Sequence, residues 1–379
     1  MKSMTPRTEE ELAEILAGAA GPLRICGGAT RPIGRPVEGP ALSLSGLGGI
    51  VEYEPGALTL VARAGTAVEE IEAALAAEGQ MLAFEPMDHR RLLGTTGTPT
   101  IGGVVAGNVS GPRRVSAVGA CRDSLLGVRF VDGRGRIARN GGRVMKNVTG
   151  YDLVKLMAGS FGTLGVLTEI CCKVLPRPET AATLVFRGLD LAGAVGVMGA
   201  ALGSPFEVSG AAHVAADGGG TAMTCLRVEG FASSVRYRVG RLQDGLARHG
   251  EVEVLDAEAT AALWHAIRDV EALARVPGDV WRLSVRPSDA PGLMARLAPG
   301  TPVQLDWGGG LIWVVTPAGQ DLRAHLAPFQ GHATLVRADA ATRAALAVFQ
   351  PEAEAVAALS RGLRSQFDPR GILNPGLMG

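Results

Sequence analysis

The sequence predicts an α+β fold: two small α/β subdomains, followed by a second domain that is itself α+β. Three observations predict it. A short apolar stretch runs into Gly27-Gly28-Ala29-Thr30, and an uncharged, glycine-rich run covers residues 92–112. After Pro176-Arg177-Pro178, strand-like and helix-like stretches alternate without a further glycine-rich loop. Glycine lets main-chain N–H groups approach a ligand closely, so the two patches indicate a nucleotide site.

The first domain is expected to cover residues 1–179. Thr8 and Glu11 form a capping-box pattern for a first helix that ends before Gly21, and Thr66 with Glu69 repeats this pattern for a second helix over 68–78. Asp132-Gly133 is a hairpin signal between two apolar runs. Strands are expected at residues 23–26, 41–45, 58–62, 125–131, 136–138 and 166–175.

The second domain is expected over residues 180–337, and a C-terminal segment over 338–379. Helices are predicted at 191–202 and 233–248, and a long terminal helix at 343–367. Two turn signals, Asp368-Pro369-Arg370-Gly371 and Asn374-Pro375-Gly376, predict that the tail returns to the first domain. Strands of the second domain are expected at 183–186, 221–228, 281–285 and 311–315.

Composition excludes several classes of protein. Lys+Arg and Asp+Glu both number 37, so the formal net charge is zero and the basic surface of a nucleic-acid-binding protein is missing. The five cysteines include no Cys-x-x-Cys pair and the six histidines lack ligand spacing, so no metal site is predicted. The apolar runs are too short or too rich in glycine for a membrane span, and the first ten residues lack a signal-peptide pattern. We expect a cytoplasmic protein.

The familiar nucleotide motifs do not fit. A Rossmann fingerprint needs G-x-G-x-x-G between a strand and a helix, and Gly46-Leu47-Gly48 lacks the third glycine. No glycine loop continues into Lys-Ser or Lys-Thr, as a P-loop requires. NAD and ATP are therefore poor candidates.

The chain resembles the FAD-binding, PCMH-type proteins of the vanillyl-alcohol-oxidase superfamily from about Leu23 to Pro178. Within that superfamily it is most similar to the E subunits of bacterial glycolate oxidase (glycolate dehydrogenase). The resemblance rests on stretches in a fixed order along most of the chain: GPRR (111–114), GACRD (119–123), GRVMKNVTGYD (142–152), MAGSFGTLG (157–165), WRLSV (281–285), DWGG (306–309), GHAT (331–334) and FDPRGILNPG (367–376).

The resemblance implies that FAD lies between the two α/β subdomains. The first glycine patch would curl around the diphosphate, and the second would form the facing wall. Arg122 and Asp123 form either a structural ion pair or a contact to the cofactor, and Lys146 and Tyr151 either lie near the nucleotide or pack at the domain seam. The expected cofactor-binding residues are Gly27, Gly28, Ala29, Thr30, Arg31, Pro99, Thr100, Ile101, Gly102, Gly103, Gly107, Ser110, Gly111, Gly119, Asp123, Gly159, Gly162, Thr163, Gly165, Val166 and Asn374.

Oxidation of a 2-hydroxy acid needs a cation for the carboxylate and a base for the hydroxyl proton. Arg282 and Arg286 are candidate clamps and His332, on an expected turn, is a candidate base; each could equally be an ordinary structural residue. The H-x-G-D-G-N-x-H type of metal motif that D-type subunits and D-lactate dehydrogenases carry is missing. After DWGG, where relatives tend to have Gln-Arg-Trp, this chain has Leu311-Ile312-Trp313.

The leading hypothesis is an FAD-binding subunit of a complex that oxidises glycolate to glyoxylate. A D-type flavoprotein subunit would be one partner, and an iron–sulfur subunit would pass electrons toward quinone at the inner membrane. The alternatives are a self-sufficient flavin-dependent 2-hydroxy-acid dehydrogenase, a non-catalytic structural subunit, and an FAD-dependent reductase of the cell-wall enolpyruvyl type.

Overall fold

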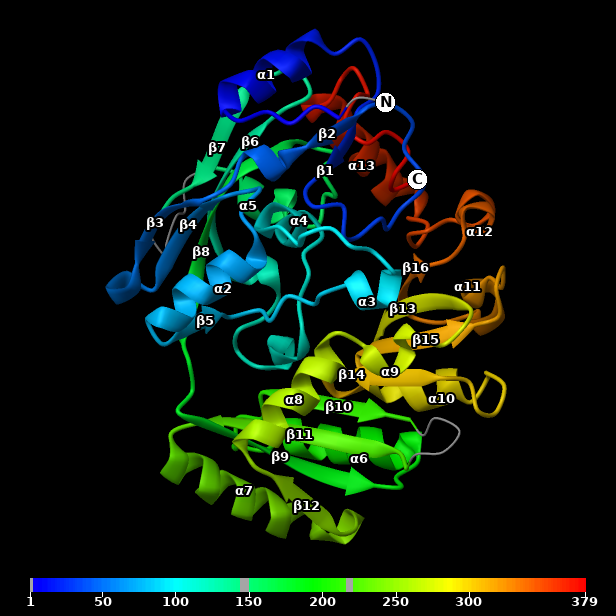
Figure 1. Ribbon diagram of the computed structural model, residues 1–379. Helices are drawn as coiled ribbons and strands as arrows, with labels where there is room; N and C mark the ends of the chain where they lie inside the picture. The colour runs from blue at the N-terminus through cyan, green and yellow to red at the C-terminus, as the bar shows by residue number, and fades with distance from the viewer. Residues whose placement is uncertain (1–2, 144–149, 216–220) are drawn as a thin grey trace.

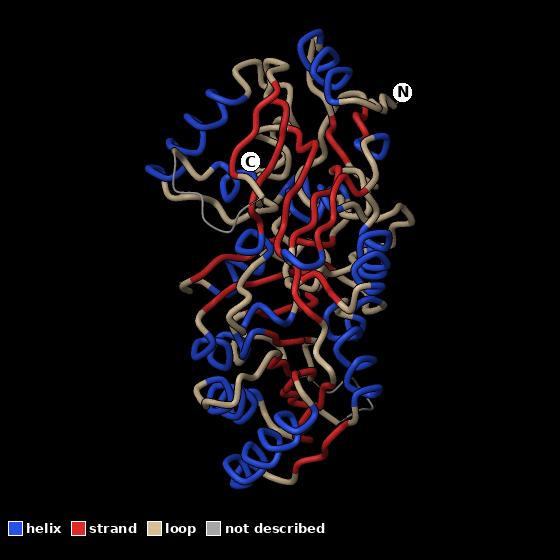
Figure 2. The backbone as a smooth tube through the Cα atoms, turned by 90° about the vertical axis from the view of Figure 1, so that its left-hand side faces the viewer, coloured by secondary structure: helices blue, strands red, loops and turns tan. Residues whose placement is uncertain are grey.

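The computed structural model describes residues 3–143, 150–215 and 221–379. Figure 1 shows an elongated molecule with two α/β parts stacked end to end, and Figure 2 shows the same elongation after a quarter turn. Both termini lie on the part built from the first half of the chain, because the C-terminal segment returns to it. No helix among the described residues is long and apolar enough to cross a membrane.

The first part is built on a six-stranded antiparallel sheet. The strand order is β3-β4-β8-β6-β7, and β5 also pairs with β8. A separate pair of short parallel strands, β1 and β2, has Cys26 opposite Ser43. The strands are β1 Arg24–Cys26, β2 Ala41–Ser43, β3 Ile50–Glu54, β4 Thr59–Arg63, β5 Gln80–Leu82, β6 Leu125–Val131, β7 Ile137–Gly141 and β8 Val166–Pro176. Asp132 closes the β6–β7 hairpin, where its Oδ1 accepts the N–H groups of Arg134 and Arg136.

Short helices cover this sheet. The predicted cap of α1 is confirmed, since the Thr8 hydroxyl accepts the N–H of Glu11 at 3.1 Å. The predicted cap of α2 is wrong: Ala67 occupies the N-cap, and the Thr66 hydroxyl donates to the carbonyl oxygens of Gly49 and Arg63. The helices are α1 Glu9–Gly18, α2 Val68–Ala77, α3 Arg90–Leu93, α4 Ile101–Ala106 and α5 Leu153–Met157.

The second part is built on an eight-stranded antiparallel sheet in the order β12-β9-β11-β10-β14-β15-β13-β16. Four of these strands, β10, β12, β14 and β16, were not predicted from the sequence. The strands are β9 Thr180–Arg187, β10 Gly210–Val214, β11 Met223–Gly230, β12 Val252–Leu255, β13 Asp279–Val285, β14 Val303–Asp306, β15 Leu311–Thr316 and β16 Gly331–Arg337. We call this part the cap domain, and its boundaries stay a proposal.

Helices pack on this second sheet, and two more lie in the C-terminal segment. The α-helices are α6 Leu191–Leu202, α7 Ala232–Leu246, α8 Ala257–Arg268, α9 Glu271–Ala274, α10 Ala290–Met294, α11 Leu322–Leu326, α12 Ala340–Ala345 and α13 Glu354–Phe367. Short 3-10 turns complete the chain: η1 Leu44–Gly46, η2 Pro55–Ala57, η3 Pro112–Val115, η4 Cys121–Ser124, η5 Ala247–His249, η6 Pro287–Asp289 and η7 Trp307–Gly309.

The predicted helix over 343–367 is wrong, because the segment splits into α12 and α13 around Pro351. Proline lacks the N–H that a helix interior needs, and it disfavours helical backbone in the residue before it. Beyond α13 the tail does return to the first part. Leu23 forms a bridge with Leu373, and the Ile25 N–H donates to Asn374 Oδ1 at 2.8 Å.

Four buried charges join the two parts. Arg113 and Glu85 belong to the first part, and Arg227 and Glu229 to β11 of the cap. Arg113 Nη2 lies 2.8 Å from Glu229 Oε1, and Arg227 Nη1 lies 2.9 Å from Glu85 Oε1. Each cation contacts both carboxylates, so the burial of the charges is compensated within the cluster. The two guanidinium groups hold the pKa of Glu85 at about 2.

Candidate functional site

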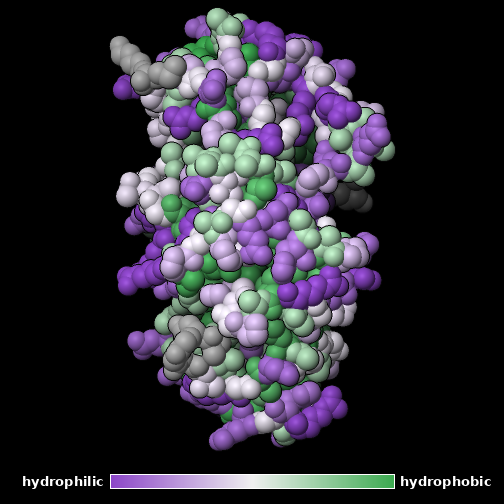
Figure 3. Space-filling view, turned by 90° about the vertical axis from the view of Figure 1, so that its right-hand side faces the viewer, coloured by the Kyte–Doolittle hydropathy of each residue, from purple (hydrophilic) through white to green (hydrophobic). Residues whose placement is uncertain are grey.

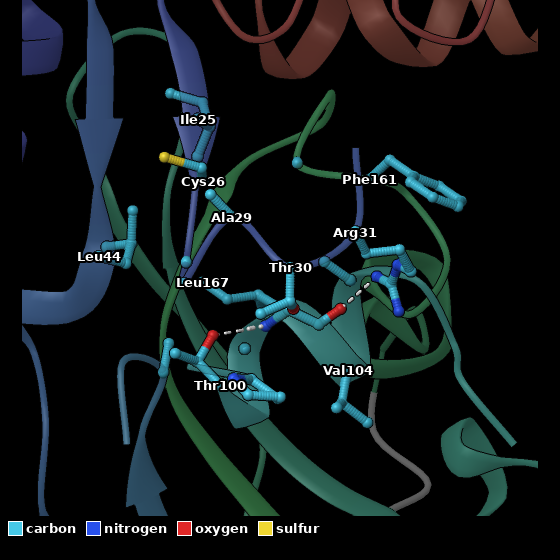
Figure 4. Close-up of a pocket in the computed structure, with 18 of the residues that line it drawn as sticks. Ile25, Cys26, Ala29, Thr30, Arg31, Leu44, Thr100, Val104, Phe161 and Leu167 are labelled. Atoms are coloured by element: carbon cyan, nitrogen blue, oxygen red, sulfur yellow. Dashed lines mark hydrogen bonds between the residues drawn. The ribbon is translucent and has the colours of Figure 1, made fainter. Parts of the chain in front are cut away.

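A cavity lies where β1, α4, the start of β8 and the C-terminal tail meet (Figure 4). It is the place where the two glycine patches face each other. Of the residues that were expected to bind the cofactor, thirteen line it: Gly27, Gly28, Ala29, Thr30, Arg31, Pro99, Thr100, Gly102, Gly103, Gly162, Gly165, Val166 and Asn374. Apolar side chains that were not predicted complete the lining, among them Ile25, Leu44, Val104, Phe161 and Leu167.

The first wall is the loop that leaves β1. A Cβ on Gly28 would lie 1.6 Å from the carbonyl oxygen of Thr98, so only glycine lets the two walls approach this closely. Ala29 has a φ of 55°, which turns the chain around the cavity. Among the described residues, the N–H groups of Gly28, Ala29, Thr30 and Arg31 donate to no acceptor. Consecutive free N–H groups of this kind form a site for an anion such as a phosphate.

The second wall is α4, and it is built differently. The Ile101 N–H donates to Thr66 O and the Gly102 N–H to Ala64 O, while the Gly103 N–H donates to the Thr100 hydroxyl. These donors are consumed within the protein, so Gly102 and Gly103 line the cavity as part of the facing wall but offer no free N–H group to a ligand. Glycine is needed at Gly102 because a Cβ would lie 2.7 Å from the Ala64 side chain.

Arg31 places a cation on the wall of the cavity. Its Nη2 donates to the carbonyl oxygen of Gly103, and its guanidinium carbon lies 5.7 Å from the ring centre of Phe161. A Cβ on Gly107 would lie 2.0 Å from this Nη2. The Arg31 side chain therefore requires glycine at position 107, and no contact to a ligand is needed to explain it. Burial lowers the pKa of Arg31 to about 10, so the group stays charged at neutral pH. No carboxylate of the described chain forms a salt bridge with it.

His89 also lines the cavity, and it was not predicted. The side chain is buried, and its Nδ1 lies 3.2 Å from the carbonyl oxygen of Met87. Burial, reinforced by the charge of Arg31, lowers the pKa of His89 to about 3, so the ring is neutral at physiological pH. A carbonyl can only accept, so Nδ1 carries the proton and Nε2 is left as an acceptor. The sequence offered a lone histidine outside any spacing pattern, and only the fold reveals its place.

Eight residues from the expected set lie outside the cavity lining: Ile101, Gly107, Ser110, Gly111, Gly119, Asp123, Gly159 and Thr163. Several have internal partners. The Ser110 hydroxyl accepts the Cys121 N–H at 2.9 Å, and Asp123 Oδ2 accepts the Ala120 N–H at 2.9 Å. Asp123 pairs with Lys155 at 3.9 Å rather than with Arg122. Lys146 lies outside the described residues.

The two candidate catalytic residues lie on the cap domain, outside the cavity lining. Arg282 is on β13, with its guanidinium carbon 5.1 Å from the ring centre of Trp307. His332 was expected on a turn, but it lies on the edge strand β16, opposite Ser284. The residue is exposed overall, but partial burial of its side chain and the charges of Arg282 and Arg114 lower the pKa of His332.

The donor set of the cavity fits FAD. Free N–H groups and the Arg31 guanidinium suit a diphosphate, and the apolar side chains suit the flat rings of the cofactor. Residues 3–141 match the family model described as "FAD binding domain". The glycolate oxidase subunit GlcE of Escherichia coli (strain K12) is 38% identical over 350 residues, covering 91% of this chain and 89% of that protein.

The chain belongs to the GlcE family. This confirms the family resemblance and the FAD cofactor that were expected from the sequence. It also confirms the expectation that the protein is an FAD-dependent oxidoreductase.

Other relatives share only part of the chain. Glycolate oxidase subunit GlcD of Bacillus subtilis (strain 168) is 30% identical over 202 residues, which are 50% of this chain and 40% of that protein. The mitochondrial D-2-hydroxyglutarate dehydrogenase of Bos taurus is 33% identical over 190 residues, which are 47% of this GlcE-family chain and 32% of that protein. The chain therefore spans less than half the length of these two relatives.

Solved structures bear out the fold. A p-cresol methylhydroxylase structure with substrate bound matches with a TM-score of 0.70 at 14% identity, over 100% of this chain and 88% of that one. An alkyldihydroxyacetonephosphate synthase structure matches with a TM-score of 0.68 at 16% identity, over 98% of this chain and 76% of that one. The α+β fold of the PCMH type is confirmed.

Proposed function

We propose that this chain is the FAD-binding subunit of a complex that oxidises glycolate, a small 2-hydroxy acid, to glyoxylate. The observation that carries the proposal is the wall formed by Gly28 to Arg31, with its four free N–H groups and its partly buried cation, in a member of the GlcE family. FAD, when bound, would supply the two-electron acceptor for the alcohol carbon and the link to the next carrier.

The residues of the chain have separable tasks in this proposal. The N–H groups of Gly28 to Arg31 hold the diphosphate, and the Arg31 guanidinium adds a positive charge beside it. Asn374 ties the tail to the first wall, because it accepts from the Ile25 N–H and its Nδ2 donates to Phe161 O at 2.9 Å. His89 offers a neutral acceptor at Nε2.

The partners are part of the proposal. A D-type flavoprotein subunit would share the oxidation, and an iron–sulfur subunit would carry electrons toward quinone. Support comes from two relatives, GlcE and GlcD, which are both subunits of glycolate oxidase. We further propose a cytoplasmic location, with any contact to the inner membrane made through those partners.

A self-sufficient 2-hydroxy-acid dehydrogenase is the second candidate. It is favoured by the position of Arg282, a cation on the cap whose charge also helps to lower the pKa of His89 in the cavity. Under this alternative, Arg282 would hold the substrate carboxylate and His332 would accept the hydroxyl proton. A third candidate, a subunit that has kept the fold without the cofactor, would purify colourless.

One experiment separates these candidates. The full chain is purified alone and with its partner subunits, the flavin absorbance is recorded, and glycolate, D-lactate and NADPH are added without oxygen. Flavin that bleaches with glycolate only when the partners are present supports the subunit proposal. Bleaching of the isolated chain by a hydroxy acid supports the self-sufficient dehydrogenase, and bleaching by NADPH contradicts both.

A further inference from the structure

Two arginines from different parts of the molecule lie against the indole of Trp307. Arg114 belongs to η3, directly after the second glycine patch, and its guanidinium carbon lies 4.3 Å from the ring centre. Arg282 belongs to β13 of the cap, and its guanidinium carbon lies 5.1 Å from the same centre and 6.0 Å from that of Trp313. The aromatic faces hold both guanidinium planes in place.

Neither guanidinium has an acidic partner in the described chain. Arg114 and Arg282 make no side-chain hydrogen bond and no salt bridge there, although both side chains are only partly exposed. The neighbouring Arg113 shows the contrast, since it pairs with Glu229 at 2.8 Å and with Glu85 at 3.3 Å. Each guanidinium has five N–H donors, so the two side chains present a set of donors without protein acceptors.

The titratable groups described near the two arginines supply no salt-bridge partner. His332 is close enough to Arg282 and Arg114 that, after burial, their charges lower its pKa, which favours its neutral form. Asp306 directly precedes Trp307 in the sequence; its carboxyl group is buried and accepts the Trp307 N–H at 2.7 Å, so it is used internally. Burial raises the pKa of Asp306 to about 7, which weakens it further as a counter-charge.

We propose that Arg114 and Arg282 together form a binding site for a small planar oxyanion, namely a carboxylate, at the junction of the FAD-binding part and the cap. The new element is Arg114: the FAD-binding part itself supplies half of the clamp, and Trp307 sets the spacing of the two cations. A carboxylate is favoured because its two oxygens match the donor fork of a guanidinium. The assignment of this carboxylate to a 2-hydroxy acid rests on the proposed function.

The test uses oxalate, a carboxylate with no alcohol carbon to oxidise. The full chain is titrated at constant ionic strength, with chloride as the balancing salt, and both tryptophan fluorescence and flavin absorbance are read. Arg114→Ala and Arg282→Ala are each expected to weaken oxalate binding by at least tenfold, because a charge-assisted, two-pronged contact is lost. Arg114→Lys and Arg282→Lys keep the charge, and we expect weakening of only a few-fold.

Arg187→Ala is the matched control, because Arg187 lies on strand β9 of the cap but is exposed and paired with Glu253 at 2.7 Å. The proposal is overturned if oxalate leaves the wild-type signals unchanged, or if the Arg187 variant loses as much affinity as the other two. If an alanine variant fails to fold, the wild-type titration and the lysine variants still decide whether Arg114 and Arg282 bind oxalate. A colourless chain would count against the proposed function, whereas the fluorescence titration would still read the oxyanion site.

Discussion

The indole Nε1 of Trp307 donates a 3.0 Å hydrogen bond to the carbonyl oxygen of Gly111. Gly111 ends the second glycine patch, and Trp307 begins η7 of the cap. Because η3 follows Gly111 directly, this bond fixes the point from which Arg113 and Arg114 reach the cap. Figure 3 shows one face of the molecule, on which hydrophilic and hydrophobic residues are interspersed.

Trp307→Phe keeps an aromatic ring but removes the donor to Gly111. We expect the free energy of unfolding to fall by about 1–2 kcal/mol beyond the loss from the smaller ring, because a buried carbonyl loses its partner. Chemical denaturation measures it. Trp281→Phe is the control, since the Trp281 Nε1 has no hydrogen-bond partner in the described chain and only packing is lost. Equal losses in the two variants would mean that the bond contributes nothing.

Gly28→Ala is expected to abolish FAD binding. The new methyl carbon would lie 1.6 Å from the Thr98 carbonyl oxygen, so the loop of the first wall must move. The flavin retained after gel filtration is the measurement. Gly196→Ala in α6 meets nothing within 4 Å and is expected to retain full flavin, with a helix stabilised by up to about 1 kcal/mol. A yellow Gly28 variant would show that the first wall does not hold the cofactor.

Arg31→Leu is expected to weaken FAD binding by at least tenfold, because the cavity loses a charged donor and gains an apolar group. Affinity is read by quenching of flavin fluorescence as apoprotein is added. Arg35→Leu removes an exposed cation four residues away and should leave the affinity within about twofold. If both variants bind FAD alike, the charge of Arg31 serves the fold and not the cofactor.

Glu85→Gln leaves Arg113 and Arg227 with one buried counter-charge fewer, and we expect a loss of about 3–5 kcal/mol in the free energy of unfolding. The pKa of Glu85 is lowered to about 2, so its contribution is complete above the unfolded-state pKa near 4.5. It is lost as the pH falls from there toward 2. Chemical denaturation is measured in steps from pH 7 to below pH 4. The free energies of unfolding of the wild type and the variant should converge as the pH falls. Curves that stay parallel would exclude this linkage.

His89→Gln tests the neutral imidazole. The unfolded chain takes up a proton near pH 6.5, whereas folded His89 does so only near pH 3, so acidification favours unfolding across that window. The wild type should therefore lose free energy of unfolding faster than the variant between pH 6.5 and 5, by up to about 1.4 kcal/mol per pH unit. The same slope in both proteins would show that folding does not lower the pKa of His89.

The sequence allowed most of the first part to be predicted, because its signals are local. Thr8 caps α1, Asp132 closes a hairpin, and glycines mark the walls. Four cap strands were missed, since their short segments depend on neighbours far along the chain. The break in the terminal helix was also missed, although Pro351 is a local signal for it. His89 and Arg114 were missed for a related reason: each acquires its surroundings only when distant segments come together.

The central claim is that the wall from Gly28 to Arg31 holds FAD in this GlcE-family chain. The visible absorbance of the purified full chain, compared with that of the Gly28→Ala variant at equal protein concentration, tests it most directly. We predict one flavin per wild-type chain and none in the variant, with both chains folded by circular dichroism. A wild-type chain that stays colourless after reconstitution with FAD, or a variant that binds as much flavin as the wild type, would contradict it.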